Sequence, residues 1–289
     1  MGDTTADALQ ELFASPTRRT PAEVAEHMAA VFRAIRGMPD KVRCVNRVTE
    51  RLIGAAGDPA LAAASRALAE AIDANAAVYD RHPYHSRQHY CEVTLAVGLL
   101  CKVHDLADRD AQLVLLAALV HDLAHDGHPS RDFRLERQSI DHALPYLKRA
   151  GVAEDACGRL AALVLATQPI EGLRYALGVR SFHAGGVDPP APPEGAPELA
   201  SLSQHEGLAR LALLLCEADI LPSVGLTFAH AMQLQDLLAH EWGRALSHED
   251  KLIFLEGVLA SGVVGSFFLP NALAIRKTVI ERVHDSREG

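Results

Sequence analysis

Apolar residues recur at helical spacing along almost the whole of this 289-residue chain. Between residues 21 and 36, for example, they lie about one helical turn apart, at Val24, Met28, Val31, Phe32 and Ile35. Strand signals are weak, because β-branched residues are sparse and the dipeptides typical of hairpin turns are absent. The sequence therefore predicts an all-α protein, a multi-helix bundle.

The helical spacing of apolar residues also predicts the individual helices and the domain organisation. Helices are expected over residues 21–36, 41–55, 59–79, 86–103, 109–125, 134–150, 153–167, 206–221, 226–243, 248–260 and 265–284. Residues 178–206 are rich in proline and glycine and lack an apolar period, which predicts a loop or insertion. We expect residues 1–80 to form a helical region packed on a domain that spans residues 81–289.

Composition and charge narrow the class of protein. Hydrophobic residues make up 49 % of the chain, which supports a large core and excludes disorder. The net charge of −9 argues against binding to a nucleic-acid polymer, because the chain has no excess of lysine and arginine to neutralise the phosphates. No apolar run is long enough for a membrane span, and the first residues lack a secretory pattern. The five cysteines form no Cys-x-x-Cys motif, as expected for reduced thiols in a cytoplasmic protein. A homo-oligomer remains open.

Seven of the fifteen histidines lie between residues 82 and 128. Two His-x-x-x-His pairs stand out there, His85 with His89 and His121 with His125, and Asp122 directly follows the first histidine of the second pair. Side chains four residues apart share one face of a helix, so each pair is expected to aim two imidazoles at one point. Histidine and carboxylate together are ligands of zinc, iron, manganese and magnesium.

The position of Asp122 strengthens this interpretation. It lies at the inner end of an apolar helix, where a carboxylate is costly unless it binds a metal or accepts several hydrogen bonds. A second doublet, His104-Asp105, serves as an internal comparison. It has no histidine four residues later and stands where a helix should end, so we expect it to have no role in metal binding.

These motifs resemble the HD superfamily of metal-dependent phosphohydrolases. Tyr-His-x-x-x-His at residues 84–89, together with His-Asp-x-x-His-x-Gly at residues 121–127, is most similar to the class I cyclic-nucleotide phosphodiesterases. The segment Cys216–Ile220 resembles the one that supplies a distant aspartate, here Asp219, to the metal site of that family. The resemblance extends over residues 80–270 and implies the phosphodiesterase-like helical fold of that family.

The resemblance implies a centre for two divalent metal ions, whose identity among zinc, iron, manganese and magnesium stays open. The first ion would be held by His89, His121, Asp122 and Asp219. Asp122 would also reach the second ion, and His125 would lie in the water shell of that ion or bind it directly.

The remaining roles concern the reaction itself. His85 matches the family's proton donor to the leaving oxygen. Two ions about 3.5–4 Å apart can hold a bridging hydroxide that attacks phosphorus in line with that oxygen. Glu136 and Ser139 either match a Glu-x-x-Ser element of bacterial HD proteins or form an outward-facing helical pair, and the sequence favours neither interpretation.

The predicted function is hydrolysis of a small phosphoester such as a 3′,5′-cyclic nucleotide. The family recognises the purine with a glutamine and an aromatic side chain, and the stretch assigned to that task, residues 259–270, contains no glutamine. One alternative is hydrolysis of nucleoside monophosphates. Another is a diiron oxygenase on the same fold, which needs extra histidine ligands, with His142 and His183 as candidates. A non-catalytic binding domain is disfavoured, because the ligand set is intact.

Overall fold

The computed structural model describes residues 13, 16–54, 57–128 and 132–288, and none of these residues forms a β-strand. The predicted all-α class is therefore confirmed. The helices are η1 (Pro16–Arg18), α2 (Pro21–Ile35), α3 (Lys41–Ile53), α4 (Pro59–Ala74), α5 (Ala76–Tyr79), α6 (Arg87–Val103), α7 (Asp108–Val120), α8 (Arg134–Ala150), α9 (Glu154–Ala166), α10 (Glu171–His183), η2 (Pro197–Leu199), α11 (Ala200–Gln204), α12 (Glu206–Val224), α13 (Phe228–Glu241), α14 (His248–Ser261) and α15 (Leu269–Glu288).

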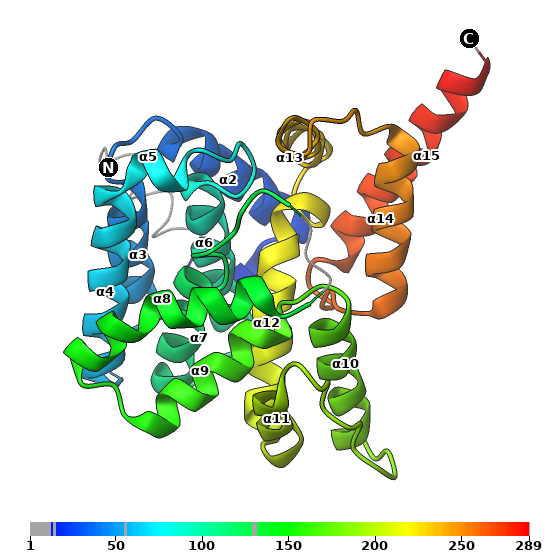
Figure 1. The fold of residues 1–289 in the computed structure, drawn as a ribbon. Coiled ribbons are helices and arrows are strands. Elements are labelled where there is room, and N and C mark those ends of the chain that lie inside the picture. The colour runs from blue at the N-terminus through cyan, green and yellow to red at the C-terminus, as the bar shows by residue number, and fades with distance from the viewer. Residues whose placement is uncertain (1–12, 14–15, 55–56, 129–131, 289) are drawn as a thin grey trace.

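Three buried helices, α6, α7 and α12, form the centre of the bundle (Figure 1). Helices α3 to α5 lie on one side of them and α13 to α15 on the other, while α2 runs between the two sets and contacts α6 and α15. The buried apolar residues of α2 and α4, such as Phe32 and Leu68, belong to the same core as Leu99 of α6 and Leu116 of α7. The N-terminal helices therefore complete the core around the helices that carry the predicted metal ligands.

The predicted loop at residues 178–206 is wrong in part. Helix α10 continues to His183, η2 and α11 occupy residues 197–204, and α12 begins at Glu206, so only residues 184–196 and His205 are irregular. The buried face of α10 consists of Gly172, Tyr175, Ala176 and Val179. Because two of these residues are small, the helical recurrence of large apolar side chains is weak in the sequence. The irregular segment is held to α8 by Arg137, which donates hydrogen bonds to the Gly195 carbonyl and to Glu198.

Helix α6 packs closely against α3 because Gly98 has no side chain. A Cβ atom at this position would collide with the Thr49 side chain of α3 and with the ring of Phe13. We expect Gly98→Ala to lower the free energy of unfolding by about 1–3 kcal/mol through overpacking. Chemical denaturation measures the change. Gly158→Ala on the exposed face of α9, where no atom lies within 4 Å, should instead raise the free energy by about 0.5–1 kcal/mol. Equal effects of the two substitutions would contradict the packing argument.

Within the described ranges, no single helix is both long and apolar enough to cross a membrane. The pair α12 and α13 meets the criterion only when taken together, and the two helices are bent by 97°. All five cysteines are unpaired, and Cys91, Cys101 and Cys216 are buried.

Candidate metal centre and its cavity

Four predicted ligands converge on one point between α6, α7 and α12. The Nε2 atom of His89 lies 3.3 Å from Asp122 Oδ2 and 3.1 Å from Asp219 Oδ1. The Nε2 atom of His121 lies 3.2 Å and 3.5 Å from the same two oxygens, and 3.3 Å from His89 Nε2. Ligand atoms arranged tetrahedrally around a zinc-sized ion are about 3.3–3.4 Å apart. His89, His121 and Asp219 therefore have the chemistry and the spacing to hold one divalent ion, and Asp122 lies beside both imidazoles.

The end of α7 explains how adjacent residues can both reach this point. The helix stops at Val120, and residues 121–124 form a turn in which His121 still has helical backbone angles, φ −53° and ψ −36°. His121 and Asp122 therefore leave the backbone about 100° apart and approach the point from two directions. The Nδ1 atom of His121 lies 2.9 Å from the Ala118 carbonyl oxygen, to which it donates a hydrogen bond. That bond fixes the ring and leaves Nε2 free for a metal.

The charges at this point attract a cation. Burial opposes the charged form of His89, but Asp122 and Asp219 outweigh it and raise the pKa of this imidazole to about 9. The two carboxylates likewise raise the pKa of His121 above its usual value. In turn the imidazoles hold the pKa of both aspartates well below the usual range, despite burial. The carboxylates therefore stay ionised and require positive charge, as protons on the histidines or as a metal ion.

This competition predicts proton release on metal binding. Below pH 9 the metal-free site holds a proton on His89, whereas a ligand imidazole must be neutral. We therefore expect the ion that binds at His89 to displace at least one proton at pH 7, and its apparent affinity to rise with pH up to about 9. Calorimetric titration with Mn²⁺ in buffers of different ionisation enthalpy counts the protons. An affinity independent of pH between 6 and 8 would contradict this balance of charges.

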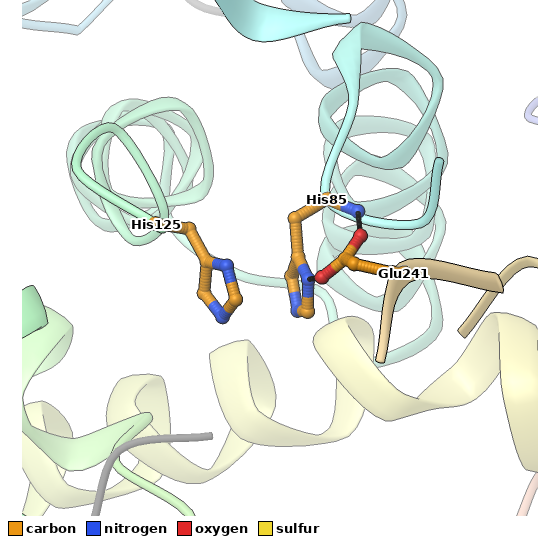
Figure 2. A group of neighbouring side chains, drawn as sticks. All are labelled: His85, His125 and Glu241. Atoms are coloured by element: carbon orange, nitrogen blue, oxygen red, sulfur yellow. Dashed lines mark hydrogen bonds and ion pairs between the residues drawn. The ribbon is translucent and has the colours of Figure 1, made fainter. Parts of the chain in front are cut away.

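The histidine pairs combine differently from the prediction. His89 meets His121, whereas the rings of His85 and His125 stack with centroids 3.4 Å apart and planes at 17° (Figure 2). The prediction that each His-x-x-x-His pair aims at one point is wrong. The physical reason is that each pair spans a helix end, because α6 begins at Arg87 and α7 ends at Val120.

Glu241 completes the second group. One of its oxygens lies 2.5 Å from His85 Nδ1, and the other accepts hydrogen bonds from the backbone N–H groups of Tyr84 and His85. Burial alone would raise the pKa of Glu241, but these bonds hold it at about 2. The ring of His85 is thereby fixed, with its Nδ1 side toward Glu241 (Figure 2). Potential ligand atoms of His85, His125 and Glu241 also lie within 4.8 Å of one another, close enough to share an ion.

The local backbone assigns a tautomer to His125. The Gly127 N–H donates a 3.0 Å hydrogen bond to His125 Nδ1, so a neutral His125 carries its proton on Nε2. Burial lowers the pKa of this imidazole to about 4. Gly127 has a φ of +82°, and a Cβ atom there would run into the ring of His82. The glycine of the motif thus allows the turn that orients His125.

Glu136 and Ser139 both point inward, so their interpretation as an outward-facing pair is wrong. The Ser139 hydroxyl accepts a 3.0 Å hydrogen bond from the Ala124 N–H and supports the turn after His121. Glu136 is 8 % exposed and lines the same cavity as Asp122 and Asp219. Its Oε2 atom has no hydrogen-bond partner among the described residues. Burial raises the pKa of this carboxyl to about 7.

A cavity of about 480 Å³ opens over these groups. Asp122, Asp219, His85, His125 and Glu136 line its inner part, and side chains of α13 and α14 form much of the remaining wall. The stretch assigned to base recognition, residues 259–270, does not line the cavity, and its Phe268 is a core residue. The wall is built instead from residues 234–254, which the sequence analysis did not single out.

The other candidates lie away from this centre. His142 is exposed and lines a separate cavity with Tyr79 and Tyr146. His183 bonds to the Leu202 carbonyl. The comparison doublet has the expected structure, because His104 is the C-cap of α6 and Asp105 follows with a φ of +48°. The extra histidine ligands expected of a diiron oxygenase are therefore not found at these positions.

The sequence matches no known family model and no curated protein. The fold, in contrast, is similar to that of solved structures. The phosphodiesterase domain of the RhoPDE fusion protein from the choanoflagellate Salpingoeca rosetta is 17 % identical, with a TM-score of 0.59 over 91 % of this chain and 93 % of that domain. LmjPDEB1 in complex with IBMX is 16 % identical, with a TM-score of 0.59 over 99 % of both chains. The predicted phosphodiesterase-like helical fold is therefore confirmed.

Proposed function

We propose that this protein is a metal-dependent phosphohydrolase that cleaves a small phosphodiester, such as a 3′,5′-cyclic nucleotide. The observation that carries the proposal is the convergence of His89, His121, Asp122 and Asp219 at the base of one cavity. The second group, His85 with Glu241, lines or adjoins the same cavity and is suited to proton transfer. The phosphodiesterase-like fold supports the same class of reaction.

Two divalent ions fit the groups available. The first would be held by the four converging side chains, and Asp122 would extend to the second. His125 would contact the second ion through water, since its Nε2 carries the proton when Nδ1 accepts from Gly127. Such ions lower the pKa of water and neutralise charge on phosphoryl oxygens.

In this proposal His85 is the general acid. The ionised Glu241 holds the Nδ1–H of His85, so that Nε2 is the position from which a proton can pass to the leaving oxygen. An alkoxide leaves poorly without that proton. Glu241 is thus a positioning residue, and its two backbone hydrogen bonds fix its own orientation.

Glu136 supplies a second titratable group beside the proposed reaction centre. Its pKa of about 7 lets it accept a proton at neutral pH. Its Oε2 atom is buried without a hydrogen-bond partner among the described residues, and the residue lines the cavity. A carboxylate of this kind can orient a water molecule toward phosphorus.

Product analysis tests the proposal. Manganese-loaded protein is incubated with bis(p-nitrophenyl) phosphate, with 3′,5′-cyclic AMP and cyclic GMP, and with 5′-AMP, using Asp122→Asn as the blank. Conversion of a cyclic nucleotide to its 5′-monophosphate supports the phosphodiesterase. Phosphate released from 5′-AMP alone would assign the protein to the nucleotidases, the alternative that uses the same site. No turnover of any diester would overturn the proposal.

A further inference from the structure

A buried lysine lines the cavity above the metal centre. Lys251 lies on the first turn of α14, and only 5 % of its surface is exposed. Its ammonium group donates a 2.8 Å hydrogen bond to the Ser223 carbonyl of α12. Burial is the sole cause that lowers the pKa of this amine to about 8, and no carboxylate of the described residues offsets its charge. A charged amine held in this way still has donors to satisfy, because an ammonium group carries three.

Lys251 is close to the proposed reaction centre. Its partner Ser223 follows Asp219 by four residues on α12, about 6 Å along the helix. The Ser223 hydroxyl also lies 3.1 Å from the Tyr84 hydroxyl, and the ring of Tyr84 lies beside that of His89, with centroids 5.2 Å apart. One small molecule could therefore contact both the metal ligands and this amine.

The surrounding wall suits a flat ring. Leu234, Leu238 and Trp242 of the α13 region and Ile253 and Phe254 of α14 line the cavity, and Phe254 is 42 % exposed. The Lys251 amine lies 5.2 Å from the centre of the Phe254 ring. The glutamine in this wall, Gln235, directs its amide nitrogen to the carbonyls of Leu246 and Ser247. Its donors are thus committed to the protein, whereas those of Lys251 are only partly used.

We propose that Lys251 is a specificity residue that selects a 6-oxopurine, the base of guanosine or inosine nucleotides, over adenine. This inference rests on the proposed function, since the nucleotide phosphate would lie at the metal centre. Guanine and hypoxanthine present two adjacent acceptors, O6 and N7, whereas adenine replaces O6 with an amino donor. An ammonium group has donors only, so it bonds to both acceptors of an oxopurine and opposes the amino group of adenine.

Equilibrium binding tests the selection without requiring turnover. Manganese-loaded protein is titrated by calorimetry with 5′-IMP, 5′-GMP and 5′-AMP. IMP is the sharpest probe, because it differs from AMP at the 6 position and lacks the 2-amino group of GMP. We expect IMP and GMP to bind about tenfold or more tightly than AMP. Equal affinities, or tighter binding of AMP, would overturn the proposal.

Two variants and a matched control assign the effect to Lys251. In Lys251→Met the affinities for IMP and AMP should differ by no more than about threefold, because the aliphatic part of the side chain remains but the hydrogen-bond donors are lost. Lys251→Gln should also abolish the preference, since an amide both donates and accepts. It keeps a polar group, so it remains a test if the methionine variant misfolds.

Lys41→Met is the control. Lys41 is also 5 % exposed and also bonds one backbone carbonyl, that of Arg36, but it does not line this cavity. The control should keep the wild-type ratio, and an unchanged ratio in both Lys251 variants would overturn the proposal.

Hydrolysis of bis(p-nitrophenyl) phosphate separates the two levels of inference. Turnover of this base-free diester, with no preference among the three nucleotides, would leave the phosphodiesterase standing and overturn the role of Lys251. Preference for IMP and GMP without turnover of any diester would support the role of Lys251 in binding and overturn the reaction proposed above.

Discussion

Asp122→Asn is expected to remove both bound metal and diester hydrolysis. The substitution preserves the shape of the side chain but removes the charge that faces both His89 and His121. Metal ions contribute several kcal/mol to phosphoryl transfer, so turnover should fall by at least about 10³-fold. Elemental analysis of the purified variant, together with its rate on bis(p-nitrophenyl) phosphate, measures the two losses side by side.

The second His-Asp doublet provides the matched control for Asp122. Asp105 also follows a histidine at a helix end, but its φ of +48° places it in an ordinary turn outside the cavity, and asparagine tolerates that backbone. Asp105→Asn should therefore retain full metal content and activity. Normal turnover in Asp122→Asn would show that the four converging side chains are not the reaction centre.

His85→Ala is expected to lower the rate in a way that depends on the leaving group. A positioned general acid contributes about 10²–10⁴-fold when the leaving oxygen is a sugar alkoxide. The loss should be much smaller with bis(p-nitrophenyl) phosphate, because p-nitrophenolate leaves without being protonated. Metal content should stay unchanged, since His85 is not among the four converging ligands. Rates on the two substrates, measured with wild type and variant, give the comparison.

His142→Ala is the control for this experiment, because that exposed histidine lies on another cavity. An equal loss on both substrates in His85→Ala would argue for a structural or metal-binding role instead. His85 is stacked beside His125 and lies close enough to share an ion with it, so the comparison distinguishes a general acid from a metal-binding residue.

The sequence analysis singled out His89, His121, Asp122 and Asp219, which the structure brings together, because local spacing carries their signal. His121 and Asp122 end an apolar helix, and a charged doublet in such a place is conspicuous. The pairing of the histidines was not predictable in the same way. It depends on where α6 begins and α7 ends, and a shift of helix ends by a few residues changes which imidazoles meet.

Residues that reach the site from distant helices gave no usable signal. Glu241 contacts His85 across 156 positions of the chain, and it appears in the sequence as an ordinary acid near the end of a helix. Lys251 similarly resembles a surface lysine on a capped helix, but the fold buries it with its amine bonded to the Ser223 carbonyl of α12. Helix α10 escaped prediction for a local reason, since glycine and alanine form much of its buried face.

The division of the cavity between two sets of helices has a consequence for how such a protein can diverge. The four converging side chains belong to α6, α12 and the end of α7, all deep in the bundle, whereas much of the outer wall belongs to α13 and α14. Substitutions that change the shape or polarity of the outer wall therefore need not disturb the four converging side chains or the core that holds them. Descendants of one ancestral gene could therefore exchange one substrate for another through substitutions in α13 and α14, while the proposed reaction centre is inherited unchanged.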